Sequence, residues 1–147
     1  MSARIRGRIL GIDYGRSRIG VAVSDPLGIT ARGLETVRWN GRDQAAAVRR
    51  ISELAREQQI CAVVIGLPRR TDGKAGESAE AARAFADSLT ESLGLEPVFW
   101  DERYTTVMAQ RTLLEVGYRK NKRDVIDQVA AEIILQEYLD KQRTADQ

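Results

Sequence analysis

The chain of 147 residues contains no histidine and a single cysteine, Cys61. Without histidine it cannot use a histidine general base, a Ser-His-Asp or Cys-His nucleophile system, or histidine ligands to zinc. One cysteine also excludes an intrachain disulfide and a cysteine-ligated structural zinc site. Any chemistry must therefore come from carboxylates, lysine, arginine, tyrosine, hydroxyl groups or a metal ion held by oxygen atoms.

Long apolar runs and a strong net charge are missing as well. No run approaches the roughly 20 residues that a membrane helix needs. Residues 1–6 carry charge but have no apolar segment behind them, so no signal peptide is predicted. We therefore expect a cytoplasmic protein without a membrane partner. Because the net charge is only +2, any contact with nucleic acid must depend on local basic clusters.

The residues that are present fit one globular domain. A chain of this length can bury a hydrophobic core without support from disulfides or structural metal ions, and 43% of its residues are hydrophobic. We expect a single domain over 1–147, with its core at about 8–140 and a frayed tail at 142–147. Cys61 lies in an apolar run and is predicted to be a buried thiol in a strand.

Hydrophobic periodicity predicts the element order β-β-β-α-β-α-β-α-α. Residues Gly66 and Leu67, before Pro68, are expected to end the fourth strand. The predicted strands are 8–13, 19–23, 28–37, 61–65 and 97–100, and the predicted helices are 43–59, 77–93, 105 or 106 to 116, and 124–140.

This order predicts an α/β fold, with one mixed five-stranded sheet and helices on both faces. Right-handed crossovers would place the two later strands beside the first strand, on the side away from the second. Asp13 and the adjacent pair Asp101 and Glu102 would then lie at neighbouring strand ends.

Three acidic positions are candidates for a metal site. Asp13 ends a buried strand, where a carboxylate is costly unless a cation such as Mg²⁺ compensates it, although aspartate is also common at turns. Asp127 precedes small residues that would let its helix approach a sheet, although it could equally be a solvated acid near a helix N-terminus. Asp101 and Glu102 point to opposite faces of a strand, so one of them is expected to join the site.

Four segments, in order along the chain, resemble one family. They are Gly11-Ile12-Asp13-Tyr14-Gly15 with Arg18–Asp25, Val64-Ile65-Gly66-Leu67-Pro68 with Asp72-Gly73, Asp101–Thr106, and Asp127–Ala131 with Ile134-Leu135-Gln136. Together they are similar to the signatures of the YqgF family, also called RuvX-like, over about residues 8–140. Arg69-Arg70 departs from the family's usual form, in which a less basic pair is expected.

The resemblance implies a ribonuclease H-like fold related to Holliday-junction resolvases. It also implies a metal-dependent nuclease that matures the 5′ end of 16S rRNA, with Mg²⁺ or Mn²⁺ as cofactor, expected as two ions. By position, Asp13, Glu102 and Asp127 would be the catalytic and metal-binding carboxylates, with Asp101 as the substitute for Glu102.

Basic residues near these acids favour a nucleic-acid partner, because lysine and arginine bind the phosphate backbone without reading its sequence. Taken singly, each cluster would be an ordinary solvated surface, and their convergence at one sheet edge favours binding. The candidates are Arg16, Arg18, Arg69, Arg70, Lys74, Arg103, Lys120, Lys122 and Arg123. The expected partner is precursor rRNA or branched DNA, with possible association with the ribosome and a monomeric or weakly dimeric chain.

Three other functions compete with the rRNA nuclease. A Holliday-junction resolvase would share the metal site but needs two active sites related by a two-fold axis. A sugar-kinase or Hsp70-type ATPase would share the first hairpin, but it needs two such domains, and the chain has no Walker A pattern. A non-catalytic RNA-binding assembly factor would not need three retained acids.

Overall fold

The computed structural model describes residues 7–15, 17–67, 75–101 and 123–145. The helix expected from residue 105 or 106 to 116 lies outside these ranges. The described residues form the strands β1 (Arg8–Asp13), β2 (Arg18–Ser24), β3 (Ala31–Arg38), β4 (Ile60–Leu67) and β5 (Val98–Asp101), and the helices α1 (Gln44–Glu57), α2 (Ala75–Leu93) and α4 (Arg123–Ala145).

The described strands join one mixed sheet in the order β3-β2-β1-β4-β5. The pairs β1–β2 and β2–β3 are antiparallel, so the first three strands form a meander. The strand β4 runs parallel to β1, and β5 runs parallel to β4. The predicted five-stranded mixed sheet is therefore confirmed, including the position of the two later strands beside β1.

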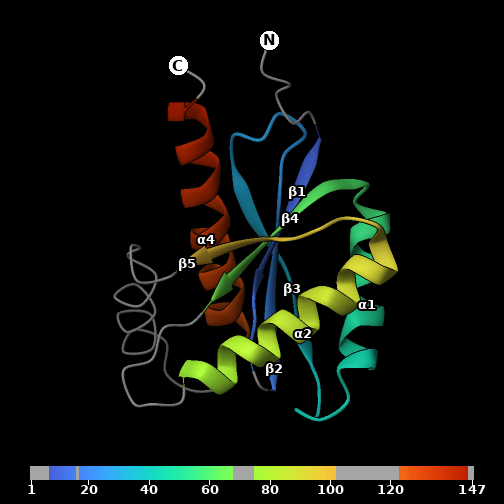
Figure 1. Cartoon of the computed structure of the whole chain (residues 1–147). Coiled ribbons are helices and arrows are strands. Elements are labelled where there is room, and N and C mark those ends of the chain that lie inside the picture. Colours follow the sequence, from blue (N-terminus) through green and yellow to red (C-terminus); the bar gives the residue numbers. More distant parts are fainter. Residues whose placement is uncertain (1–6, 16, 68–74, 102–122, 146–147) are drawn as a thin grey trace.

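Helices cover both faces of the sheet, with α1 and α2 on one face and α4 on the other (Figure 1). Alternation along β1 divides the core between the two faces. Leu10 and Ile12 pack in the cluster beneath α1 and α2, whereas Ile9 packs in the cluster beneath α4. Burial on both faces explains why β1 and β2 are almost continuously apolar in sequence.

The helix α4 is also fixed to the edge strand β3 through hydrogen bonds. The Oε1 atom of Gln136 accepts from the Ala31 backbone N–H at 3.0 Å, and Glu132 Oε1 accepts from the Gly33 backbone N–H. Four residues of helix rise about 6 Å and two residues of strand about 6.6 Å, so the two spacings match. These bonds set the position of α4 along the sheet and satisfy two N–H groups of an edge strand.

Several boundaries differ from the prediction. Gly66 and Leu67 continue β4 instead of ending it, because Gly66 pairs with β1 and Leu67 with β5. The helix α4 begins at Arg123 and continues to Ala145, five residues beyond the predicted end at 140. The helix α2 starts at Ala75, two residues earlier than expected, and β5 covers Val98–Asp101 rather than 97–100.

The strand β3 begins at Ala31 rather than at residue 28, because the preceding turn is held by Asp25. The Asp25 carboxylate accepts hydrogen bonds from the backbone N–H groups of Ile29 at 2.7 Å and Thr30 at 2.9 Å. These bonds, the one from Thr30 foremost, lower the pKa of Asp25. Cys61 does lie in a strand, but it is only partly buried, so the prediction of a buried thiol is wrong.

None of the described helices is long and apolar enough to cross a membrane.

Candidate active site at the carboxyl end of β1

Glycines on three strands allow α4 to lie directly on the sheet. A Cβ atom on Gly20 of β2 would lie 2.0 Å from the backbone oxygen of Asp127, and one on Gly11 of β1 would lie 2.7 Å from the Leu135 Cβ. A Cβ on Gly33 of β3 would lie 3.1 Å from the Gln128 Cβ. Such close approach has no room for larger side chains, so these glycines place the first turns of α4, and with them Asp127, against β2.

Asp13 lies next to the contact between Gly20 and Asp127. It is the last residue of β1 and pairs with Gly20 of β2 in the antiparallel ladder. Residues directly opposite in such a ladder project on the same face, with Cα atoms about 4.5–5.5 Å apart. Gly20 faces α4, so Asp13 also lies on the α4 face, beside Asp127. Its side chain is buried, with 6% relative exposure.

Arg18 links this edge of the sheet to α4. Its Nε donates to Asp127 Oδ2 at 2.8 Å, and the two side chains retain 31% and 15% of their exposure. Arg18 stands two residues before Gly20 on β2, and so on the same face. The sequence favoured Arg18 as a nucleic-acid contact and gave no sign of this ion pair, which joins residues 109 positions apart.

The carboxyl ends of β1, β4 and β5 meet at the same edge. Gly66 of β4 pairs with Asp13, and Leu67 of β4 pairs with Asp101 of β5. The predicted shared edge is therefore confirmed, but β4 lies between the two acidic strand ends, so they are not immediate neighbours.

Trp100 anchors the end of β5 on the α4 face. Its indole Nε1 donates to Glu137 Oε2 at 3.3 Å, and its ring meets the Tyr138 ring edge-on with centroids 5.9 Å apart. The Lys141 Nζ lies 5.5 Å from the centre of the Trp100 ring. These contacts tie β5 to α4 one residue before Asp101.

The remaining predicted site residues are mostly not described. Arg123 is the first residue of α4. Glu102, Arg16, Arg69, Arg70, Lys74, Arg103, Lys120 and Lys122 lie outside the described residues. In the part of the chain that the structure describes, no three acidic or cysteine side chains come together as a metal-binding group.

A comparison with known protein families shows to which family the chain belongs. The model of the RuvX family, described as a Holliday junction resolvase, matches residues 7–141. The chain belongs to the RuvX family.

Proteins that are similar to this chain over nearly its whole length occur in several organisms. The chain is 52% identical over 135 residues to a protein of Moorella thermoacetica named "Putative pre-16S rRNA nuclease", with 91% of this chain and 95% of that protein covered. Proteins of the same name from Acetivibrio thermocellus and Myxococcus xanthus are each 49% identical, over 135 and 140 residues. The first alignment covers 90% of this chain and 95% of that protein, and the second covers 95% and 91%.

Among solved structures, the fold of this RuvX chain is similar to that of Thermus thermophilus RuvC. The RuvC structure in complex with a Holliday junction substrate superimposes with a TM-score of 0.64 at 15% identity, covering 93% of this chain and 96% of that one. A second RuvC structure gives a TM-score of 0.58 at 17% identity, with the same coverage. At such identities the likeness shows a shared fold, which confirms the predicted ribonuclease H-like architecture.

The donor atoms at this edge fit a hard divalent cation. Asp13 and Asp127 supply carboxylate oxygens on one face of the sheet, and Mg²⁺ and Mn²⁺ prefer oxygen ligands. Two carboxylates brought together repel each other unless positive charge is shared between them. In the structure Arg18 supplies one such charge to Asp127.

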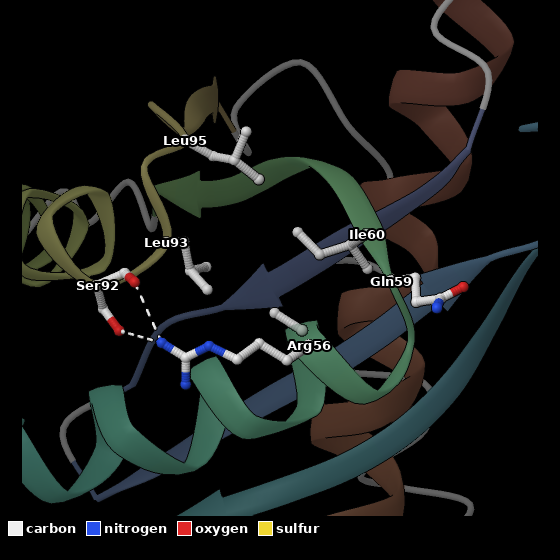
Figure 2. A pocket seen from close by; sticks show the side chains of 7 residues that line it. Arg56, Gln59, Ile60, Ser92, Leu93 and Leu95 are labelled. Atoms are coloured by element: carbon white, nitrogen blue, oxygen red, sulfur yellow. Dashed lines mark hydrogen bonds between the residues drawn. The ribbon is translucent and has the colours of Figure 1, made fainter.

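Two hollows on the described surface lie away from these acids, beside α1 and α2. One of about 170 Å³ is bounded by the C-terminal ends of α1 and α2 and by the start of β4, where Arg56 Nη2 donates to the backbone oxygen of Ser92 at 3.2 Å (Figure 2). It lies at the end of β4 opposite Gly66, and no carboxylate lines it. This hollow lacks the acidic groups that the candidate chemistry requires.

Proposed function

We propose that the chain is a metal-dependent nuclease that hydrolyses phosphodiester bonds in precursor 16S rRNA, at its 5′ end. The observation that carries the proposal is the placement of Asp13 and Asp127 on one face at one edge of a ribonuclease H-like sheet. The names of relatives that are about half identical to this chain supply the substrate class.

Glu102 is proposed as the third carboxylate, with Asp101 as its substitute. Trp100 lies on the α4 face, where it contacts Glu137 and Tyr138. Side chains alternate along a strand, so continuation of β5 by one residue would bring position 102, rather than 101, to the face that holds Asp13 and Asp127.

Asp13, Glu102 and Asp127 would hold Mg²⁺ or Mn²⁺, proposed as two ions. A bound divalent cation of this kind activates a water molecule and stabilises the charge that develops on the phosphate. The buried position of Asp13 keeps its carboxylate in one orientation, and the bond from Arg18 orients Asp127. The backbone contact at Gly20 keeps the two acids together.

The proposed partner is RNA, bound through its phosphates by the basic residues around this edge. Of those predicted, Arg18 lies beside Asp127, and Arg123 begins the helix that carries Asp127. The other predicted contacts are Arg16, Arg69, Arg70, Lys74, Arg103, Lys120 and Lys122. A role in rRNA maturation would place the protein in the cytoplasm in association with the assembling ribosome, as a monomer or weak homodimer.

The second candidate is cleavage of branched DNA, since the description of the RuvX family names a Holliday junction resolvase. It would use the same carboxylates, so the two candidates differ in substrate and not in the proposed chemistry at the site.

The test compares wild type with the Asp13→Asn variant on a labelled precursor rRNA fragment in Mg²⁺, in Mn²⁺ and in EDTA. We expect cleavage by wild type in either metal, no cleavage in EDTA, and a loss of at least about 100-fold in the variant. The melting temperature of Asp13→Asn should stay equal to or above that of wild type, because the change relieves repulsion between carboxylates. Undiminished cleavage by the variant would rule out the proposed role of Asp13.

A further inference from the structure

The turn between β1 and β2 joins two residues of the candidate site. Asp13 ends β1, and Arg18, which binds Asp127, begins β2. The turn is tight, since a Cβ atom on Gly15 would lie 2.4 Å from the backbone oxygen of Arg18. The position of this turn therefore affects the carboxylate at one of its ends and the guanidinium group at the other.

Trp39 holds this turn from the end of β3 with two hydrogen bonds. Its indole Nε1 donates to the backbone oxygen of Gly15 at 3.0 Å. Its backbone N–H donates to the backbone oxygen of Ser17, also at 3.0 Å. One bond reaches the turn next to the end of β1 and the other next to the start of β2, so both sides of the turn are tied to the same residue.

Tyr14 gives the turn a second contact with Trp39. The Tyr14 ring packs against two aromatic rings, with centroids 6.0 Å from that of Trp39 and 5.0 Å from that of Phe85 on α2. Its hydroxyl accepts a hydrogen bond from Gln44 Nε2 of α1 at 2.9 Å. Tyr14 is buried in the core beneath α1 and α2. The backbone directly after Asp13 is thereby fixed to both helices.

Trp39 lies on the face of the sheet opposite the acids, because it packs against the core beneath α1 and α2. It therefore acts on Asp13 through the backbone of the turn and not as a ligand. The chain after Trp39 is itself held in place. Asn40 Oδ1 accepts from the backbone N–H of Asp43 at 2.7 Å, and Asp43 caps the N-terminus of α1. A fixed Trp39 in turn keeps the turn in a fixed position.

We propose that Trp39 is a positioning residue, which holds the carboxylate of Asp13 in place for a divalent cation through the bond from its indole to Gly15. The inference rests on the proposed nuclease function and adds to it a residue from the other face of the sheet. Groups that orient metal ligands matter because their loss typically weakens metal binding or activity by about 10–100-fold.

Trp39→Phe tests the indole bond alone. Phenylalanine keeps an aromatic ring beside Tyr14 and the backbone N–H that binds Ser17, but it cannot donate to Gly15. We expect Mn²⁺ to bind this variant about tenfold more weakly than wild type, as measured without substrate from the EPR signal of free Mn²⁺. In cleavage of a precursor rRNA fragment at saturating Mn²⁺, kcat should fall about tenfold and KM should stay within about twofold, because the contacts with RNA phosphates are unchanged.

Ser52→Ala is the control for a general loss of stability. Ser52 of α1 is buried, and its hydroxyl oxygen lies 2.7 Å from that of Ser92 on α2, away from the acids. Each variant loses one hydrogen bond, so the melting temperature of both should fall by about 2–4 °C. Ser52→Ala should nevertheless keep the Mn²⁺ affinity and the kcat of wild type.

An unchanged Mn²⁺ affinity and kcat in Trp39→Phe would overturn the positioning role, as would equal losses in Trp39→Phe and Ser52→Ala. If wild type binds Mn²⁺ more tightly than Asp13→Asn does and cleaves RNA while either result holds, only this inference fails. A wild type that binds Mn²⁺ no better than Asp13→Asn and leaves RNA intact would overturn the inference together with the proposed function.

Discussion

Asp13 and Asp127 show how single residues prepare the site before any cation binds. Asp13 is almost fully buried at the end of β1, so its carboxylate has little freedom to move. Asp127 is more exposed and has Arg18 as its counter-ion at 2.8 Å. An ion pair at a partly exposed position contributes about 0–1 kcal/mol to stability, so its main effect is to hold the Asp127 carboxylate in one place.

Glu35 provides a test of charge pairing at a residue away from the site. Its carboxylate on β3 binds Arg50 of α1 in a two-bond geometry, at 2.8 Å to Nε and 2.7 Å to Nη2. These hydrogen bonds lower the pKa of Glu35 below its ordinary value of 4.5. A carboxyl group whose pKa is lower in the folded state stabilises the fold above its unfolded pKa, and this stabilisation is lost as the pH falls through the folded value.

We therefore expect Glu35→Gln to melt below wild type at pH 7, with the difference shrinking as the pH falls below 4.5. Thermal unfolding of both proteins between pH 7 and pH 3 measures this. Glu53→Gln is the matched control, because Glu53 binds the same arginine through a single bond at 3.0 Å and is half exposed. A difference between Glu35→Gln and wild type that stays constant over the whole pH range would contradict the assignment.

At the scale of elements, the contact between α4 and β2 decides the geometry of the site. A Cβ atom at position 20 would lie 2.0 Å from the Asp127 backbone oxygen and 2.5 Å from its carbonyl carbon. Neither atom belongs to a flexible side chain, so the whole first part of α4 would have to move. Displacement of α4 would separate Asp127 from Asp13.

Gly20→Ala should accordingly lose stability and cleavage together. Overpacking of this kind costs about 1–3 kcal/mol, which corresponds to a fall of several degrees in melting temperature for a chain of this size. The control is Gly33→Ala, whose added Cβ meets only side-chain atoms, of Gln128 at 3.1 Å and of Glu132 at 3.4 Å, and should leave cleavage near wild type. Thermal melts and the rRNA assay measure both effects, and a fully active Gly20→Ala would show that close approach of α4 is not required.

Part of the fold and of the candidate site could be predicted from the sequence, and part depends on how the elements pack. The sheet order followed from hydrophobic runs and right-handed crossovers, which act over whole elements. The end of β4 could not be predicted, because a glycine followed by Leu67-Pro68 is typical of a strand end. Gly66 stays in the sheet through its pairing with Asp13 of β1 and Trp100 of β5. The Arg18–Asp127 bond depends on how α4 docks, although Gly11, Gly20 and Gly33 on one face were a usable sign of a helix lying close.

At the scale of the whole molecule, the question is which nucleic acid binds at the edge of the sheet that carries Asp13 and Asp127. The acids lie at an edge of the sheet, and the hollow between α1, α2 and β4 lies at the other end of β4. Sequence relatives near 50% identity are named for pre-16S rRNA, whereas the RuvC structures share only 15–17% identity and so inform the fold alone. The rRNA substrate therefore has the stronger support.

We expect wild-type protein to process single-stranded or lightly structured precursor rRNA faster than it cuts a four-way DNA junction symmetrically. Paired cuts across a junction need two active sites related by a two-fold axis, and hence a stable dimer. The measurement offers both substrates under one metal and salt condition, with Asp13→Asn as the control for contaminating nucleases and sedimentation to establish the oligomeric state. Efficient paired nicking by a dimer, alongside inert rRNA, would reverse the ranking in favour of a resolvase. Inactivity on both substrates, with RNA binding retained, would instead indicate a non-catalytic assembly factor, because the acids would then be present without the chemistry that they are proposed to perform.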